Sequence, residues 1–396
     1  MTSLWTGAAG AALPDDHAHA TLVGRVWNPA VAGPSVVCLR EGQLIDLSAV
    51  FPTMRSLTEH PEPAAAVAAA SGPVLAAFDA AYASTANADM SAVRLLSPID
   101  LHVVKAAGVT FPVSMLERII EEKARGDADA AHGIRLTILD ALGTDLAGLV
   151  PGSPEAARLK NVLIGEGLWS QYLEVGIGPD AEIFTKAPVL ASVGTAVEVG
   201  IRGDSEWNNP EPEVVLVIAS DGRIVGATLG NDVNLRDIEG RSALLLPQAK
   251  DNNASAAVGP FIRLFDDGFD LDRLRAETVA VHVAGTDGFV MSASSPLAQI
   301  SRDPADLAGQ ALGAHHQYPD GLVLYLGTMF APIDDRDEPD RGFTHHVDDV
   351  VTIASPALGA LVNRVGRSEE IAPWTFGIAD LYENLAARGL LGRASA

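Results

Sequence analysis

Two apolar runs separated by an Asp-Gly pair constrain this chain more than any other feature of its sequence. EVVLVIA ends at Ala219, SDGR follows at residues 220–223, and IVGATLGND begins at Ile224. Asp-Gly is the preferred central pair of a two-residue type I′ turn. The sequence therefore predicts a buried antiparallel hairpin in which Ser220 faces Arg223.

Two acids open the first of these runs, on either side of Pro212. In a strand, Glu211 and Glu213 share one face, with Cα atoms roughly 6.5–7 Å apart. The predicted register puts Gly230 opposite Glu213, where it is expected to leave space above the sheet. The same register puts Asp232 opposite Glu211, at a Cβ separation of about 4.5–5.5 Å.

Three carboxylates on one face repel each other unless a cation or protons intervene. Oxygen ligands suit a hard divalent ion, so we predict a site for Mg²⁺, with Mn²⁺ or Ca²⁺ as alternatives. Three protein ligands leave positions for water or a substrate, which indicates catalysis. The alternative is a frayed, solvated hairpin end. Arg236 and Asp237, close behind Asp232, favour the buried site because they add charge among apolar strands.

Other polar residues give weaker signals. Lys250 lies between LLLPQA and a run of small residues, so we expect partial burial and a role as a base or as a substrate ligand. The alternative is an ordinary surface lysine. His345 and His346 are adjacent, cannot chelate together from a strand, and are interpreted as surface or loop histidines.

Composition excludes several classes of function. The formal net charge is −24, from 51 acidic and 27 basic residues, so nucleic acid would be repelled. No apolar run reaches the roughly 18 residues that span a bilayer. The N-terminus does not resemble a signal peptide. Cys38 is the single cysteine and is expected to be buried, and its isolation favours a cytoplasmic protein.

The chain predicts an α+β architecture, rich in β-strands and with peripheral helices. Residues 1–98 are expected to form a smaller β-rich N-terminal domain, and residues 99–396 a catalytic domain. A helix is predicted over 114–125, where Ser114 and Glu117 have the spacing of a capping box. A second helix is predicted over 135–150, and a third after Ser153.

The motifs resemble, in order, the fumarylacetoacetate hydrolase family. They are the acids of EPEVVLV, GNDVNLRD, the lysine of KDNNASAAVGPF, the GT of YLGTMFAP and DDVVTIASPALGALVNRV. The resemblance implies a twisted β-sheet roll, assembled as a homodimer or a dimer of dimers. It implies that Mg²⁺ is held by the three carboxylates and is chelated by an α-keto acid. It also implies that Lys250 is an active-site lysine and that Lys186, Arg236 and Thr328 contact substrate.

One departure from the family bears on the reaction. Hydrolases of the family carry a histidine and a glutamate three residues apart, which together activate water. Here Ser114 stands at the position of the histidine and Glu117 at the position of the glutamate. Serine cannot act as a general base near pH 7, and we expect Ser114 to cap the helix. The altered helix start and the length of the chain resemble family members that dehydrate 2-keto-3-deoxy sugar acids.

The expected function is therefore a Mg²⁺-dependent dehydratase of a 2-keto-3-deoxy-pentonate, of the arabinonate or xylonate type. The product would be 2,5-dioxopentanoate. Lys250, Glu174 and Glu117 are the candidate catalytic residues and Ser114 is a candidate substrate ligand, although Glu174 also suits the surface of a helix end. Two alternatives are a hydrolase of 2,4-diketo acids and a keto acid binding protein without catalysis.

Overall fold

The structure is a computed structural model that describes residues 9–125, 127, 131, 149–165, 169–330, 332, 334–339 and 341–392. In this part of the chain, the larger of two main sheets contains eleven strands. These are β1 (Leu22–Asn28), β2 (Gly33–Arg40), β3 (Gln43–Asp46), β4 (Val74–Ala77), β5 (Arg94–Leu96), β6 (Val103–Gly108), β7 (Glu182–Ala187), β10 (Pro212–Ile218), β11 (Ile224–Asp232), β13 (Ala256–Leu264) and β16 (Leu322–Tyr325). Their order is β4-β3-β2-β1-β13-β11-β10-β16-β6-β7, and β5 pairs with β1.

The second main sheet packs against the first through a shared apolar core. Its order is β15-β14-β17-β18-β8. The strands are β8 (Val197–Ile201), β14 (Thr278–Ala284), β15 (Val290–Pro296), β17 (Val350–Ser355) and β18 (Gly359–Arg367). A short pair, β9 (Asn208–Asn209) and β12 (Asn234–Leu235), extends the line of the β10–β11 hairpin.

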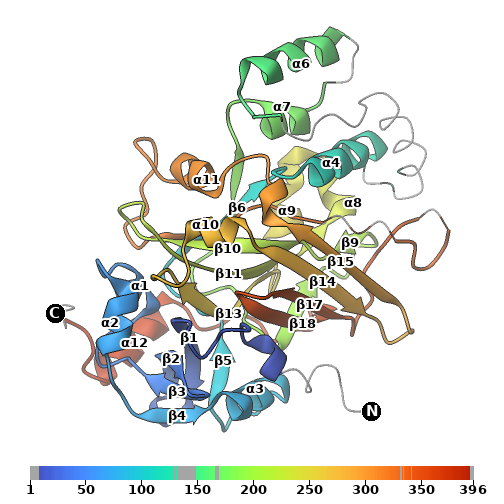
Figure 1. Ribbon diagram of the computed structural model, residues 1–396. Helices are drawn as coiled ribbons and strands as arrows, with labels where there is room; N and C mark the ends of the chain where they lie inside the picture. The colour runs from blue at the N-terminus through green and yellow to red at the C-terminus, as the bar shows by residue number, and fades with distance from the viewer. Residues whose placement is uncertain are drawn as a thin grey trace.

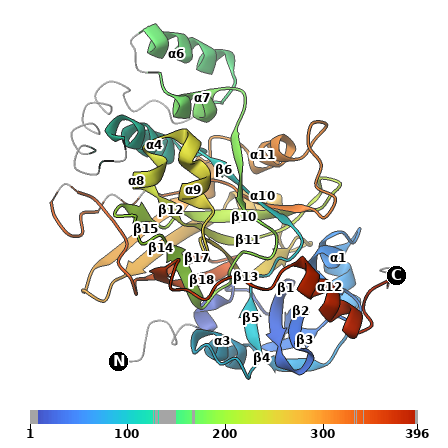
Figure 2. The ribbon, with the colours of Figure 1, turned by 180° about the vertical axis from the view of Figure 1, so that it is seen from behind.

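Helices surround the sheets. They are α1 (Met54–Thr58), α2 (Pro63–Ala69), α3 (Phe78–Ala86), α4 (Pro112–Ala124), α6 (Pro154–Gly165), α7 (Gln171–Ile177), α8 (Arg236–Glu239), α9 (Leu246–Lys250), α10 (Leu271–Arg275), α11 (Pro304–Ala311) and α12 (Ile378–Ala387). Figure 1 shows α4, α6 and α7 at one end of the molecule and the N-terminal strands at the other. Figure 2 shows α12 beside β1 and β2, and α8 and α9 near α4. None of the described helices is long and apolar enough to span a bilayer.

The β10–β11 hairpin forms in the predicted register where it matters for the site. Glu213 pairs with Gly230 and Val217 with Gly226. The turn itself differs from the prediction. The Ala219 N–H bonds to the carbonyl of Arg223, so the loop has three residues and Ser220 does not face Arg223. A register shift after Val217 compensates for the longer loop, and the two departures cancel before the strands reach the acids.

The N-terminal strands continue the sheet of the rest of the chain. β1 pairs with β13 through Leu22 with Arg263 and Val23 with Ile262. Asn384 of α12 also donates to the carbonyl of Val31, at 2.8 Å. The separate N-terminal domain that we predicted is therefore not confirmed, because the expected boundary near residue 98 falls inside one continuous sheet.

Helix α4 begins two residues earlier than predicted. Pro112 occupies its first turn and Phe111 precedes it. Ser114 is therefore not the N-cap but the third helical residue, and its Oγ reaches back to accept from Phe111 N at 3.3 Å and donate to Phe111 O at 2.9 Å.

The start of α6 is as predicted, since Ser153 Oγ accepts from Ala156 N. Residues 135–148 of the other predicted helix lie outside the described residues.

Two further predictions concern single side chains. Cys38 is buried in β2, as expected. His345 lies in a loop, but its prediction as a surface residue is wrong, because the side chain is buried and its Nδ1 lies 3.2 Å from Asp349 Oδ2. His346 is partly exposed beside Asp337. The two imidazoles therefore contact different carboxylates.

Candidate active site

Three buried carboxylates meet at the open end of the β10–β11 hairpin. One oxygen each from Glu211, Glu213 and Asp232 lies within 4.8 Å of the others, and these residues are at most 3% exposed. The Asp232 N–H donates to Glu211 O at 3.0 Å, which continues the ladder. The Gly327 N–H donates to Glu213 Oε2 at 2.7 Å. The strands thus aim three acids at one point, and the alternative of a solvated hairpin end is wrong.

The space that we expected above Gly230 is filled. A Cβ atom added to Gly230 would lie 2.3 Å from Cε1 of Tyr325. The Tyr325 hydroxyl continues past the glycine and donates to Ala257 O at 2.7 Å. Glycine is therefore needed opposite Glu213 for close packing of the aromatic ring. The ring lies close enough to the cluster that, besides burial, the charges of Asp232 and Glu213 raise the pKa of the Tyr325 hydroxyl.

Two buried lysines neutralise part of this charge. Lys250, at the end of α9, donates to Glu211 and lies 3.1 Å from Asp232 Oδ2. Lys186 of β7 lies 2.7 Å from Asp232 Oδ1 and donates to Val233 O at 3.1 Å. Both residues are at most 3% exposed. The structure thus brings together the two lysines that the sequence assigned to the site.

An arginine that sequence reasoning missed forms the other side of the cluster. Arg118 of α4 donates to Glu211, and its NH1 lies 2.6 Å from Glu121 and 2.8 Å from Glu239. Arg236 lies behind it, with Nε 3.1 Å from the second oxygen of Glu121. Arg118 and Glu121 have the i,i+3 spacing of a helix pair, but no spacing rule predicts the contacts with Glu211 and Glu239, because these join separate segments of the chain.

The charges at the site do not balance. Six carboxylates and four basic groups give a formal charge of −2 when all are ionised. They are Glu121, Glu182, Glu211, Glu213, Asp232 and Glu239, with Arg118, Lys186, Arg236 and Lys250. A divalent cation would make this set neutral, and the oxygen ligands are those that Mg²⁺ prefers. The donor set therefore fits a hard divalent ion.

The same imbalance acts on the pKa values. Burial raises the pKa of Glu213 well above its usual range, and the charges of Asp232 and Glu211 add to the shift. Burial also opposes ionisation of Asp232, but Lys186 and Lys250 hold the pKa of Asp232 below its usual value. In the absence of a metal, the raised pKa therefore favours the protonated form of Glu213. A cation that binds there releases that proton.

A small cavity lies beside the three carboxylates, and a fourth acid, Glu182 of β7, also lines it. Burial and the neighbouring charge of Glu239 raise its pKa to about 7. The sequence holds a signal for this residue. In the strand AEIFTKA, Glu182, Phe184 and Lys186 alternate along one face, so a lysine at the site predicts the glutamate four residues before it.

Two predicted catalytic acids are not part of the cavity wall. Glu174 of α7 forms an ion pair with Lys160, and its side chain is 44% exposed. It is a surface acid on a helix, which was the alternative interpretation. Glu117 of α4 is buried, but it is not among the residues that line the cavity around the three carboxylates. Glu182, and not Glu174, is the acid that lines the cavity beside the three carboxylates.

The predicted substrate ligands are distributed around the cavity. Ser114 and Thr328 line it. The Thr328 hydroxyl donates to Phe330 O at 2.8 Å. Arg236 does not line the cavity, and it is linked to the cluster through its ion pair with Glu121. The cavity itself measures only about 10 Å³, which is about the space of one water molecule. A keto acid can therefore enter only if the side chains that close the site move.

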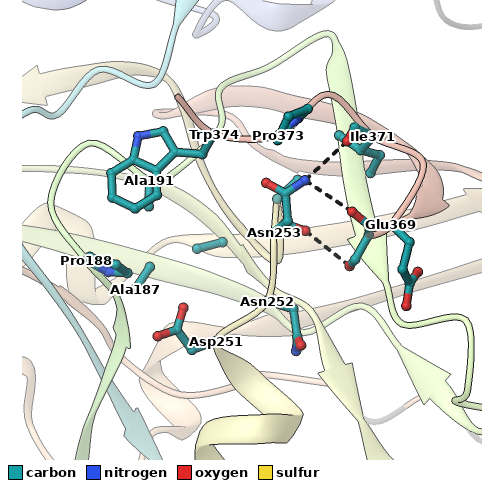
Figure 3. A pocket seen from close by; sticks show the side chains of 13 residues that line it. Ala187, Pro188, Ala191, Asp251, Asn252, Asn253, Glu369, Ile371, Pro373 and Trp374 are labelled. Atoms are coloured by element: carbon teal, nitrogen blue, oxygen red, sulfur yellow. Dashed lines mark hydrogen bonds between the residues drawn. The ribbon is translucent and has the colours of Figure 1, made fainter. Parts of the chain in front are cut away.

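A larger cavity of about 490 Å³ lies beyond the backbone that carries the two lysines. Ala187 follows Lys186, and Asp251 follows Lys250, and both line it (Figure 3). In Figure 3, Asn253 bonds to the segment that leads to Trp374 and closes one wall. The wall contains two acids and no basic residue. This cavity is therefore poorly suited to an anionic keto acid, although it is the roomier of the two.

No protein-family model matches the chain. The chain is 32% identical over 193 residues to 2-dehydro-3-deoxy-D-arabinonate dehydratase of Saccharolobus solfataricus. It is 31% identical over 202 residues to a probable 2-keto-3-deoxyxylonate dehydratase of Haloferax volcanii. These matches cover 48% and 49% of this chain, but only 60% and 63% of the two relatives.

Solved structures extend the similarity over most of the chain. The apo form of 2-keto-3-deoxy-D-arabinonate dehydratase aligns with a TM-score of 0.62 and 22% identity, over 87% of this chain and 99% of that one. The chain shares the fold of this dehydratase. The form complexed with magnesium and 2,5-dioxopentanoate gives 0.61, with the same identity and coverage. A 5-carboxymethyl-2-hydroxymuconate delta-isomerase from Mycobacterium smegmatis gives 0.52 at 18% identity, over 87% of this chain and 98% of that chain. The predicted β-rich α+β fold and the resemblance to sugar acid dehydratases are confirmed.

Proposed function

We propose that this protein is a Mg²⁺-dependent dehydratase that converts a 2-keto-3-deoxy-pentonate to 2,5-dioxopentanoate. The observation that carries the proposal is the cluster of three buried carboxylates with Lys250 and Glu182 in the same cavity. Two relatives named as dehydratases of such acids support the substrate class. A structural neighbour complexed with magnesium and 2,5-dioxopentanoate supports the metal and the product.

Glu211, Glu213 and Asp232 would hold the metal, because their oxygens converge and the site carries excess negative charge. When bound, a divalent ion polarises the C2 carbonyl of the keto acid and makes the C3 protons more acidic. Mn²⁺ and Ca²⁺ are alternatives with the same preference for oxygen. We also propose, from the single cysteine, that the chain acts in the cytoplasm and, from the family resemblance, that it assembles as a homodimer or a dimer of dimers.

Glu182 and Lys250 have complementary protonation states for eliminating water. A pKa of about 7 allows Glu182 to accept the C3 proton at neutral pH. Burial disfavours the charged form of Lys250, but Asp232 and Glu211 raise its pKa above the usual value. Lys250 therefore carries a proton in this setting, and we assign it the proton that leaves with the C4 hydroxyl as water.

The overall conversion needs no redox partner. Glu182 gains a proton as Lys250 loses one, the C3–H and C4–O bonds break, and a C3–C4 double bond forms. Transfer of a C5 proton to C3 then gives an enol with a C4–C5 double bond, and transfer of the enol O–H proton to C4 converts C5 to an aldehyde. The result is a 2,5-dioxo acid that differs from the substrate by one molecule of water.

The environment of Ser114 favours dehydration over cleavage of a carbon–carbon bond. A hydrolase needs a base that activates water, and the family histidine is replaced here by a serine. The Ser114 hydroxyl both accepts from and donates to the backbone of Phe111. Its observed contacts are those of a residue that stabilises the start of α4.

Incubation of the purified protein with 2-keto-3-deoxy-arabinonate or 2-keto-3-deoxy-xylonate tests the proposal. We expect Mg²⁺-dependent formation of 2,5-dioxopentanoate, measured by chromatography of its hydrazone derivative. Release of pyruvate, or a rate that does not change when Mg²⁺ is chelated, would contradict it.

A further inference from the structure

We propose that Arg118 is an internal counter-ion that yields Glu211 to the metal and then binds the carboxylate of the keto acid. This inference rests on the proposed function, because it assigns one residue two successive tasks at that site. Nothing in the sequence motifs points to Arg118.

Both oxygens of Glu211 are engaged by cations. Arg118 NH2 donates to Oε1, and Lys250 Nζ donates to Oε2. All three residues are buried. A metal ion that uses Glu211 as a ligand therefore competes with these two cations for the same carboxylate.

The remaining contacts of these cations favour release of Arg118. The other carboxylate partner of Lys250 is Asp232, which is itself a proposed metal ligand. Arg118 instead keeps Glu121 and Glu239, neither of which belongs to the three-carboxylate cluster. It can give up Glu211 without losing its place, because Glu121 and Glu239 both lie against NH1 of the guanidinium.

The donor freed in this way faces the position of the substrate. Arg118 lines the cavity together with Ser114, Glu182 and Thr328. Arginine binds carboxylates through directional, charge-assisted hydrogen bonds. The released NH2 group is thus suited to the carboxylate of an α-keto acid, which would make Arg118 a determinant of specificity for anionic substrates.

Calorimetric titration with Mg²⁺ at pH 8 separates this proposal from a purely structural role. Arg118→Gln removes the competing cation, and a neighbouring charge typically shifts the ionisation of a carboxylate by about 1–3 pKa units. We therefore expect Arg118→Gln to bind Mg²⁺ at least about tenfold more tightly than wild type. Arg118→Lys keeps the charge and should stay within about threefold. Arg263→Gln, which removes a buried arginine paired with Asp16 outside the cavity, should bind Mg²⁺ like wild type.

Titration of the Mg²⁺-loaded proteins with pyruvate tests the second task. We expect the affinity of Arg118→Gln for pyruvate to fall at least about tenfold, since a charge-assisted hydrogen bond is lost. Weaker or unchanged Mg²⁺ binding by Arg118→Gln, or unchanged pyruvate binding, would overturn the inference. Failure of wild type to bind Mg²⁺ would instead refute the proposed function.

A measurement on wild type covers the case in which Arg118→Gln does not fold. The side-chain Nε–H signal of Arg118 in ¹⁵N-arginine-labelled protein, assigned by its loss in Arg118→Lys, should shift when Mg²⁺ is added. A signal that does not respond to saturating Mg²⁺ would overturn the inference.

Discussion

Replacement of Glu182 by glutamine tests the assignment of the base. Glutamine keeps the shape of the side chain in β7 but cannot accept a proton. Removal of a general base typically lowers the rate by about 10²–10⁴-fold. We expect a loss of that size in kcat for Glu182→Gln, measured with 2-keto-3-deoxy-arabinonate at saturating Mg²⁺.

The pH dependence of wild type gives the same test an independent readout. Because burial raises the pKa of Glu182 to about 7, its basic form increases as the pH rises through that value. Mg²⁺ in the same cavity favours the ionised carboxylate, so the acid limb of the loaded enzyme should lie at or below about pH 7. At one unit below its midpoint the rate should be about a tenth of the plateau.

Two results would refute the role of Glu182. One is a Glu182→Gln variant that retains more than a tenth of the wild-type kcat. The other is a variant that keeps the acid limb of the wild-type profile. Glu174→Gln is the matched control, because Glu174 is an exposed acid paired with Lys160, and its kcat should stay within about twofold of wild type.

Further predictions concern the metal ligands, pH and packing. Glu213→Gln should keep the fold by circular dichroism but lose at least about 100-fold in Mg²⁺ affinity by calorimetry. Loss of a residue that only hydrogen-bonds to a metal ligand typically costs about 10–100-fold. Metal-free wild type should lose thermal stability as the pH rises from 5 to 8, because the raised pKa values of Glu213 and Glu182 make the folded state bind more protons than the unfolded state. Saturating Mg²⁺ should remove that loss, and a melting temperature that rises with pH without metal would contradict it. Gly230→Ala should lower the free energy of unfolding in urea by about 1–3 kcal/mol, because its Cβ would overlap Tyr325; an unchanged value would contradict the packing.

The cluster of three carboxylates could be predicted because it depends on local rules. Alternation along a strand put Glu211 and Glu213 on one face, and pairing across the hairpin added Asp232. The turn was wrong by one residue, yet the register at the acids was right because a bulge after Val217 restored it. Buried apolar residues along both strands favour this register over its neighbours.

The rest of the site depends on contacts between distant segments. Arg118 lies 93 residues from Glu211 in the sequence, and only the packing of α4 on the hairpin end brings them together. The pairing of β1 with β13 spans most of the chain in the same way. Alternation along β7 could have predicted Glu182, whereas the predicted catalytic acid was Glu174. For Ser114, the boundary of α4 moved by two residues because Pro112 is favoured in a first helical turn.

Carbon-13 NMR of the complete reaction tests the central claim most directly. Uniformly ¹³C-labelled 2-keto-3-deoxy-arabinonate is incubated with the protein, with and without Mg²⁺. The account predicts that all five carbons remain in one product, with a new aldehyde or aldehyde-hydrate signal at C5, only when Mg²⁺ is present. Labelled pyruvate and a two-carbon fragment, or the same product after Mg²⁺ is removed, would contradict it.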